Sequence, residues 1–172
     1  MLSLIDSKTK RRLLYGLVLL AVYLLQTTRG LLPRPWGATV NLFPFLVCSM
    51  AFSDGPYAGG LFGFAAGLLL AVGSGTPEGL DAGLYAVYGI LCGYGATTVL
   101  HRGYSSELAC GVLLSLVRCL LGWLVYYGLA YGAPMGRYLL TWFIGLVCSA
   151  ALSLPAHALL RAIARRYRED TL

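Results

Sequence analysis

Charged residues are scarce in this chain: Asp, Glu, Lys and Arg make up 12% of its 172 residues. A soluble domain has about 25%. Hydrophobic residues make up 58%, the mean hydropathy is +0.73, and the polar connections between the apolar runs are short. The connections are too short to form a water-filled active-site domain on either side of a membrane. The composition therefore predicts an all-α polytopic membrane protein with a single transmembrane domain over residues 1–172.

The residues that carry most enzyme chemistry are also rare. There are two histidines and seven acidic residues, with no Ser/His/Asp set, no HExxH, no phosphate-binding loop and no cluster of intramembrane acids. The five cysteines lie in apolar runs, form no CxxC motif and have no histidine at metal-ligand spacing. We therefore expect no enzyme activity, no cofactor and no metal site. The net charge is +6, but the basic residues belong to no soluble domain that could bind a nucleic acid, so nucleic acid is not an expected partner.

The apolar runs predict six transmembrane helices between two basic tails. The tails are residues 1–12 and 161–172, and the helices cover about residues 13–27, 38–52, 57–72, 80–99, 107–131 and 139–160. With both termini in the cytoplasm, nine Lys and Arg residues lie inside (Lys8, Lys10, Arg11, Arg12, Arg102, Arg161, Arg165, Arg166 and Arg168) and three outside (Arg29, Arg34 and Arg137). This asymmetry favours cytoplasmic N- and C-termini, with the basic tails near anionic lipid.

Glycines recur every four residues in the third and fourth predicted helices, at Gly59, Gly63 and Gly67 and at Gly89 and Gly93. This spacing places the glycines of each helix on one face. Small residues let helix backbones approach closely in lipid, where little hydrophobic force drives helices together. Two interpretations stay open: packing inside one subunit, or a docking face for the transmembrane helix of a partner.

Two polar segments break the central apolar runs. Ser53 to Pro56 (SDGP) predicts a tight turn, which makes the second and third helices an antiparallel hairpin. The second segment, GSGTPEGLD, is a hinge that contains Ser74, Gly75 and Gly79. Its acids Glu78 and Asp81 lie near the start of the fourth helix, where negative charge suits the helix dipole.

Three polar residues fall inside predicted helices: Arg118, Asn41 and His157. An arginine near the middle of a span is costly unless it is paired, hydrated or able to extend to the interface. Its expected partners are His157, a freed backbone carbonyl or a partner protein, because no acid lies in a predicted span. A structural and a functional role for Arg118 both stay open. Asn41 is expected to cap a helix or to bond a neighbouring carbonyl.

The central pattern resembles a known family. It comprises a glycine, an apolar run, GLL, S-G, G-L and an apolar helix that ends in G-Y; its residues are Gly63, Gly67, Leu68, Leu69, Ser74, Gly75, Gly79, Leu80, Tyr85, Gly89, Gly93 and Tyr94. Over about residues 20–100 the chain is similar to the rod shape-determining protein MreD family, including the segment Ala51 to Gly59. It departs from the family where Ala71 and Val40-Asn41 replace a frequent aspartate and Pro-Asp.

The resemblance implies a non-enzymatic subunit of the bacterial cytoplasmic (inner) membrane. Members of that family associate with MreC, a single-pass membrane protein, and through it with MreB and the RodA–penicillin-binding-protein synthase that elongates the cell wall. The architecture it implies is related to the substrate-binding (S) components of transporters. We expect the MreC helix to lie in a cleft between the glycine-bearing helices.

An alternative function is the substrate-binding subunit of an energy-coupling-factor vitamin transporter. Such subunits have a similar size and six helices. They commonly carry an Ala-x-x-x-Ala face on the first helix, which GLVLLAVYLLQ lacks. The aromatic residues near the end of the fifth predicted helix, Trp123, Tyr126, Tyr127 and Tyr131, are the best support for a ligand pocket.

Overall fold

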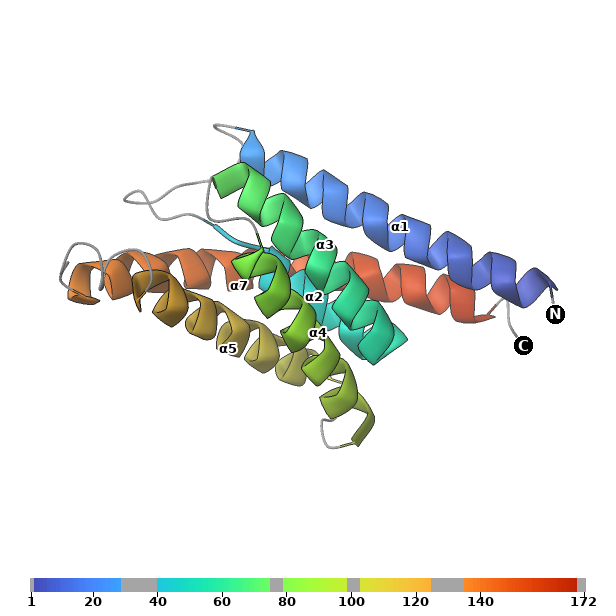
Figure 1. The fold of residues 1–172 in the computed structure, drawn as a ribbon. Helices are drawn as coiled ribbons and strands as arrows, with labels where there is room; N and C mark the ends of the chain where they lie inside the picture. The colour runs from blue at the N-terminus through green and yellow to red at the C-terminus, as the bar shows by residue number, and fades with distance from the viewer. Residues whose placement is uncertain (1, 29–39, 75–78, 99–102, 125–134, 170–172) are drawn as a thin grey trace.

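The chain folds into helices throughout the part that the computed structural model describes, which is residues 2–28, 40–74, 79–98, 103–124 and 135–169 (Figure 1). In these ranges six α-helices follow one another: α1 (Leu2–Thr27), α2 (Phe43–Asp54), α3 (Pro56–Ser74), α4 (Leu80–Thr98), α5 (Tyr104–Gly122) and α7 (Met135–Glu169). The prediction of an all-helical fold with six helices is confirmed.

The two basic ends are helical, and they extend the predicted first and last helices. α1 begins at Leu2 and α7 continues to Glu169, well beyond the predicted limits of 13 and 160. Leu, Lys, Arg and Ala are good helix formers, and nothing in either segment interrupts the helix that it extends. The start of α1 and the end of α7 lie at the same end of the molecule (Figure 1). We call this the terminal end.

Helix bounds elsewhere differ in instructive ways. α4 matches its predicted limits within one residue. α2 begins at Phe43, later than predicted, with Pro44 in its first turn, where a missing backbone donor costs least. α5 begins at Tyr104, earlier than predicted, and its regular part ends at Gly122. Residues 38–39 and 125–131 of the predicted second and fifth helices lie outside the described residues.

Helix α2 is the centre of the bundle. Every residue from Phe43 to Phe52 is buried, and the main core cluster joins α2 to side chains from α1, α3, α4, α5 and α7. α3 follows after the single residue Gly55, whose positive φ of 88° suits a residue without a Cβ. α3 then runs back along α2, as Figure 1 shows. The predicted hairpin between residues 53 and 56 is confirmed.

The glycine faces of α3 and α4 pack against each other. A Cβ added to Gly63 would overlap the carbonyl oxygen of Tyr85, and one added to Gly67 would overlap the backbone of Ala82. Gly59 and Gly89 face each other in the same way, and a Cβ on Gly93 would overlap Pro56. The five glycines therefore serve packing inside the chain, and they leave no glycine cleft between α3 and α4 for a partner helix.

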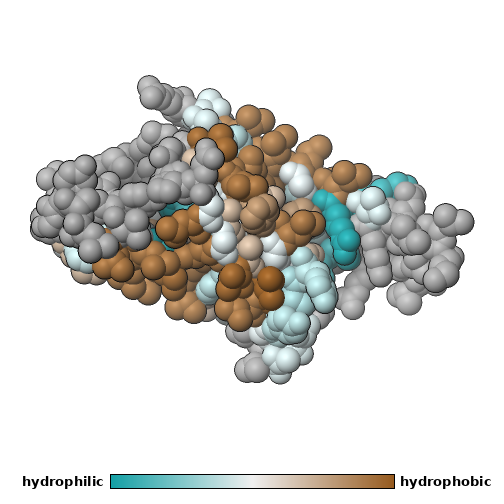
Figure 2. All heavy atoms as spheres, viewed as in Figure 1, coloured by the Kyte–Doolittle hydropathy of each residue, from teal (hydrophilic) through white to brown (hydrophobic). Residues whose placement is uncertain are grey.

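The outer surface of the bundle is strongly apolar. Large hydrophobic side chains are exposed on all the described helices except α2, with Leu13 at 69% and Val72 at 72% exposure. Figure 2 shows the hydrophobic atoms as a broad band across the middle of the visible face. Within the described residues, two helices are long and apolar enough to cross a membrane: α5, and the part of α7 from Tyr138 to Ala162.

Candidate functional site

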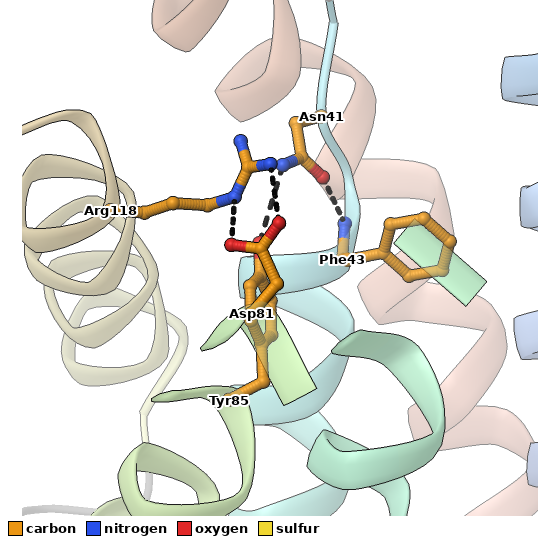
Figure 3. A network of polar contacts seen from close by, with 5 residues as sticks. All are labelled: Asn41, Phe43, Asp81, Tyr85 and Arg118. Carbon is orange, nitrogen blue, oxygen red and sulfur yellow. Dashed lines mark hydrogen bonds and ion pairs between the residues drawn. The ribbon is translucent and has the colours of Figure 1, made fainter. Parts of the chain in front are cut away.

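Arg118 on α5 is paired with Asp81 on α4. Its Nε donates to Oδ1 and its Nη2 to Oδ2 of the carboxylate, both at 3.1 Å (Figure 3). The side chains are 29% and 13% exposed. Two parallel bonds between a guanidinium and a carboxylate form the strongest common type of protein ion pair.

This pair corrects the expectation for Arg118, whose partner is neither His157 nor a backbone carbonyl. The prediction placed Arg118 in the middle of a helix over 107–131; α5 is described from Tyr104 to Gly122, and its Arg118 lies beside the start of α4. Asp81 lies in the first turn of α4, and this helix start faces Arg118. The expected favourable position of Asp81 at a helix start is confirmed, but its ion pair was not foreseen.

Asn41 and Tyr85 extend this polar group into the bundle. The Oδ1 of Asn41 accepts from the backbone N–H of Phe43 at 3.2 Å, so Asn41 satisfies a donor in the first turn of α2, although the N-cap residue is Leu42. Its Nδ2 donates to the hydroxyl of Tyr85 at 3.2 Å, and its backbone N–H donates to Ser149 Oγ at 2.9 Å. Tyr85 is completely buried. Asn41 thus ties the start of α2 to α4, as Figure 3 shows, and its backbone N–H adds a bond to α7.

A second polar group lies near the terminal end and contains His157. The Nδ1 of His157 on α7 is 2.6 Å from Glu107 Oε2 in the first turn of α5. Arg161 Nη2 lies 3.7 Å from the other carboxylate oxygen. The hydroxyls of Tyr104 and Ser153 are 3.2 Å apart, and the Tyr104 ring contacts the imidazole. His157 therefore pairs with an acid of α5.

A small cleft opens beside Glu107, between α2, α5 and α7. Its cavity volume is about 10 Å³, which is room for about one water molecule. Its wall is largely apolar, with a few polar groups at one end; it consists of Leu42, Phe45, Leu46, Ser49, Tyr104, Glu107, Leu108, Ser153, Ala156, His157 and Leu160.

A third ion pair fastens the extended start of α1 to the turn between α2 and α3. Arg11 Nη2 lies 2.6 Å from Asp54 Oδ1, and the carboxylate is only 2% exposed. The basic segment before residue 13 therefore does more than carry charge at the membrane surface. It holds α1 against the end of α2.

The remaining predicted residues have structural positions. Ser74 is the last residue of α3, and Gly79 precedes α4 with a φ of 112°, which favours glycine. Gly75, the third residue of the predicted hinge motif, lies outside the described residues. Cys48 and Cys92 are buried with their sulfurs 3.8 Å apart, and all five cysteines are free thiols.

The pairing of Asp81 with Arg118 and of Glu107 with His157 was not predicted from the sequence. Two signals pointed to them. Both acids lie in the first turn of an apolar helix, where the carboxylate can turn inward. Ser149, Ser153, His157 and Arg161 also recur every four residues, which places them on one face of α7. A polar face on an apolar helix predicts polar partners on its neighbours.

The described side chains form ion pairs and hydrogen bonds with one another. Among the residues that the structure describes, no group of three or more His, Cys, Asp and Glu side chains is placed to hold a metal ion.

Comparison of the chain with protein-family models, curated proteins and solved structures finds no match. The function must therefore be argued from the geometry and the sequence.

Proposed function

We propose that this chain is a non-enzymatic scaffold subunit of the bacterial cytoplasmic membrane, with a role like that of the MreD family. In this role it crosses the membrane six times with both ends in the cytoplasm. It binds an MreC-like single-pass protein and helps couple that protein, and indirectly MreB and the RodA–penicillin-binding-protein synthase, to peptidoglycan synthesis and rod shape.

One observation carries the membrane placement: the bundle has apolar residues outside and ion pairs inside. Exposed leucines such as Leu17, Leu61 and Leu140 cover the outer faces, while Asp81, Arg118 and Glu107 turn inward. A soluble protein rarely exposes apolar patches beyond a few hundred Å². In lipid, by contrast, exposed apolar side chains carry no cost. Charged side chains are costly there unless they pair inside the bundle.

Helix length supports the same placement. α3, α4 and α5 each have 19 residues. At 1.5 Å per residue this gives about 28 Å, close to the roughly 30 Å of a hydrocarbon core. α2 has 12 residues, about 18 Å, and is too short to cross alone. Because α2 is buried among the other helices, its ends are shielded from lipid by protein.

The scaffold role rests on the resemblance in sequence and on how the polar groups are used. The described polar side chains inside the bundle hold helices together: Asp81 pairs with Arg118, and Glu107 pairs with His157. Such pairing gives shape rather than a reactive centre. The glycine faces are filled from within the chain, so an MreC-like helix docks instead on an outward face.

Gly83 on α4 marks a suitable outward position. It is exposed, and a Cβ built there meets no atom within 4 Å. It lies on one face with Leu80, Val87 and Ile90, which are also exposed. A notch of this kind lets a partner helix approach closely. We therefore propose that the partner helix docks on α4 over Gly83.

Co-expression with an affinity-tagged MreC-like protein tests this function. The wild-type chain should be captured in mild detergent, and Gly83→Leu should reduce capture at least several-fold while leaving membrane insertion and stability unchanged. Gly16→Leu is the matched control, since Gly16 on α1 also has open space around it. Failure of the wild-type chain to be captured would contradict the function. Equal capture of Gly83→Leu would contradict the docking face alone.

The transporter alternative gains no support from the described residues. The cleft beside Glu107 has room for about one water molecule. A vitamin site needs several hundred Å³. It would also face outward to receive its substrate. Capture of a transporter scaffold with its ATPase subunits would support this alternative instead.

A further inference from the structure

The hydroxyl of Ser49 on α2 is buried, and within the described part of the chain its Oγ makes no hydrogen bond. The residue is 3% exposed, so bulk solvent does not supply the bond either. A buried hydroxyl without a partner is costly, and native proteins usually give it a protein group or an ordered water. Ser49 lines the cleft between α2, α5 and α7, so its partner is expected in that cleft.

From the size and the lining of the cleft we propose that it binds one ordered water molecule, which bridges Ser49 on α2 to Glu107 and Tyr104 on α5. The cavity volume of about 10 Å³ is close to the smallest space that holds a water. A buried water typically makes about three hydrogen bonds. All three proposed partners line the cleft.

The hydroxyl groups around the cleft leave the right donors and acceptors for this water. Ser153 donates its hydrogen to the Ala150 carbonyl at 2.7 Å, so the 3.2 Å contact between Tyr104 and Ser153 uses the hydrogen of Tyr104. The Tyr104 oxygen therefore keeps lone pairs for another donor. The water accepts a bond from Ser49 and donates to Glu107 and Tyr104.

The Glu107 carboxylate is already paired, and this pairing favours a neutral ligand. Its Oε2 is 2.6 Å from His157 Nδ1, and its Oε1 is 3.7 Å from Arg161 Nη2. A cation in the cleft would compete with these two basic side chains for one carboxylate. A carboxylate has about four acceptor sites, so a water donates to it without displacing either side chain.

The position of the cleft gives water a route to it. Glu107 lies in the first turn of α5, at the start of the apolar stretch Tyr104–Gly122. Its partner His157 lies near the end of the apolar stretch Tyr138–Ala162 of α7. In the membrane placement proposed above, both residues are therefore at the edge of their spans, where the hydrated headgroup layer begins.

A crystal structure of the full chain in a lipidic phase, at a resolution that shows ordered waters, tests the site directly. We expect one water peak in the cleft, within hydrogen-bond distance of Ser49 Oγ and of the Glu107 carboxylate. A cleft without a water peak would overturn the proposal, and so would a direct hydrogen bond from the Ser49 hydroxyl to a protein group.

The sign of one stability change gives a second test. If the water bridges Ser49, Ser49→Ala removes a hydrogen bond and should lower the ratio of folded to unfolded protein about fivefold in an SDS titration. If the hydroxyl has no partner, the same change removes a costly group, and the ratio should stay the same or rise. An unchanged or higher ratio would overturn the proposal.

Ser53→Ala is the matched control on α2. Ser53 lies one turn further along the helix, is absent from the cleft lining, and donates to the backbone carbonyl of Ser49 at 2.9 Å. Such bonds back to the preceding turn add little stability, so the ratio should change less than about twofold. An equal fall in both variants would overturn the proposal. If Ser49→Ala does not fold, the wild-type water peak decides the question. Neither test depends on capture of the protein partner.

Discussion

Arg118 and Asp81 are 37 residues apart in the chain and make two hydrogen bonds of 3.1 Å between α5 and α4. The pair joins the first turn of α4 to α5, beside the amide of Asn41 and the hydroxyl of Tyr85 (Figure 3). It therefore gives Arg118 a structural partner inside the chain.

Asp81→Asn should destabilise the protein by about 2 kcal/mol, between the roughly 0–1 kcal/mol of an exposed pair and the 3–5 kcal/mol lost when one partner of a buried pair is removed. The guanidinium of Arg118 would then lose its counter-charge. Unfolding in mixed micelles with increasing SDS measures the change. The double variant Asp81→Asn, Arg118→Gln should cost less than the two single changes added together. Additive losses would show that the two side chains do not interact.

Gly63→Ala should destabilise the α3–α4 pair by about 2 kcal/mol, the usual cost of overpacking a close contact. Its new methyl group would overlap the backbone of Tyr85, which has no room to move away. Gly83→Ala is the matched control on α4, where a Cβ meets open space, and it should be neutral or slightly stabilising. The same SDS titration compares them. Equal stability of the two variants would contradict the packing of the glycine faces.

Cys48 and Cys92 should resist thiol reagents while the bundle is folded. Their exposures are 0% and 4%, and buried structural thiols are inert. Maleimide labelling of variants that keep one cysteine each, followed by mass measurement, should modify these two only after denaturation. Cys148, which is partly exposed, is the comparison. Rapid labelling of Cys48 in the folded protein would show that α2 is not the centre of the bundle.

Arg11→Gln should loosen α1 at the terminal end. Its guanidinium lies 2.6 Å from the carboxylate of Asp54, which is almost fully buried. We expect a loss of about 2 kcal/mol in the SDS titration, for the same reason as at Asp81. The neighbouring change Arg12→Gln removes an exposed cation and should cost less than about 0.5 kcal/mol. A loss at Arg12 as large as that at Arg11 would mean that charge in this segment matters more than the ion pair.

Sequence patterns predicted most of the helices because their signals are local. The limits of α4, the turn at Gly55 and the hydrogen bond that Asn41 accepts at the start of α2 each depend on a few neighbouring residues. The glycine spacing correctly indicated close helix contact. The structure then showed that these glycines pack inside the chain and do not form a docking face for a partner. That choice depends on which helix lies opposite, and spacing alone does not contain this information.

The ion pairs could not be predicted in the same way. Arg118 was assigned to the middle of a long span, so acids at helix starts were set aside as partners. The fold places α5 so that Arg118 lies beside Asp81 in the first turn of α4. His157 was considered only for Arg118, whereas Glu107 is close to it because α5 and α7 run side by side there. In each case, the partner that a side chain meets depends on how far the two helices are shifted relative to each other along their axes.

The basic ends illustrate a different limit. Charge at the ends of an apolar run marks where a span stops, but it does not stop the helix. The charge pattern therefore did not predict where α1 begins or where α7 finishes.

The most direct test of the central claim, that the chain is a membrane scaffold subunit, is purification of the tagged chain from its native membranes in mild detergent, with mass spectrometry of the proteins that accompany it. The account predicts a single-pass protein with a coiled-coil domain of the MreC kind, at a stoichiometric level and absent from a control purification. Recovery of a transporter scaffold with its ATPase subunits would contradict the account and establish the vitamin-transporter alternative instead.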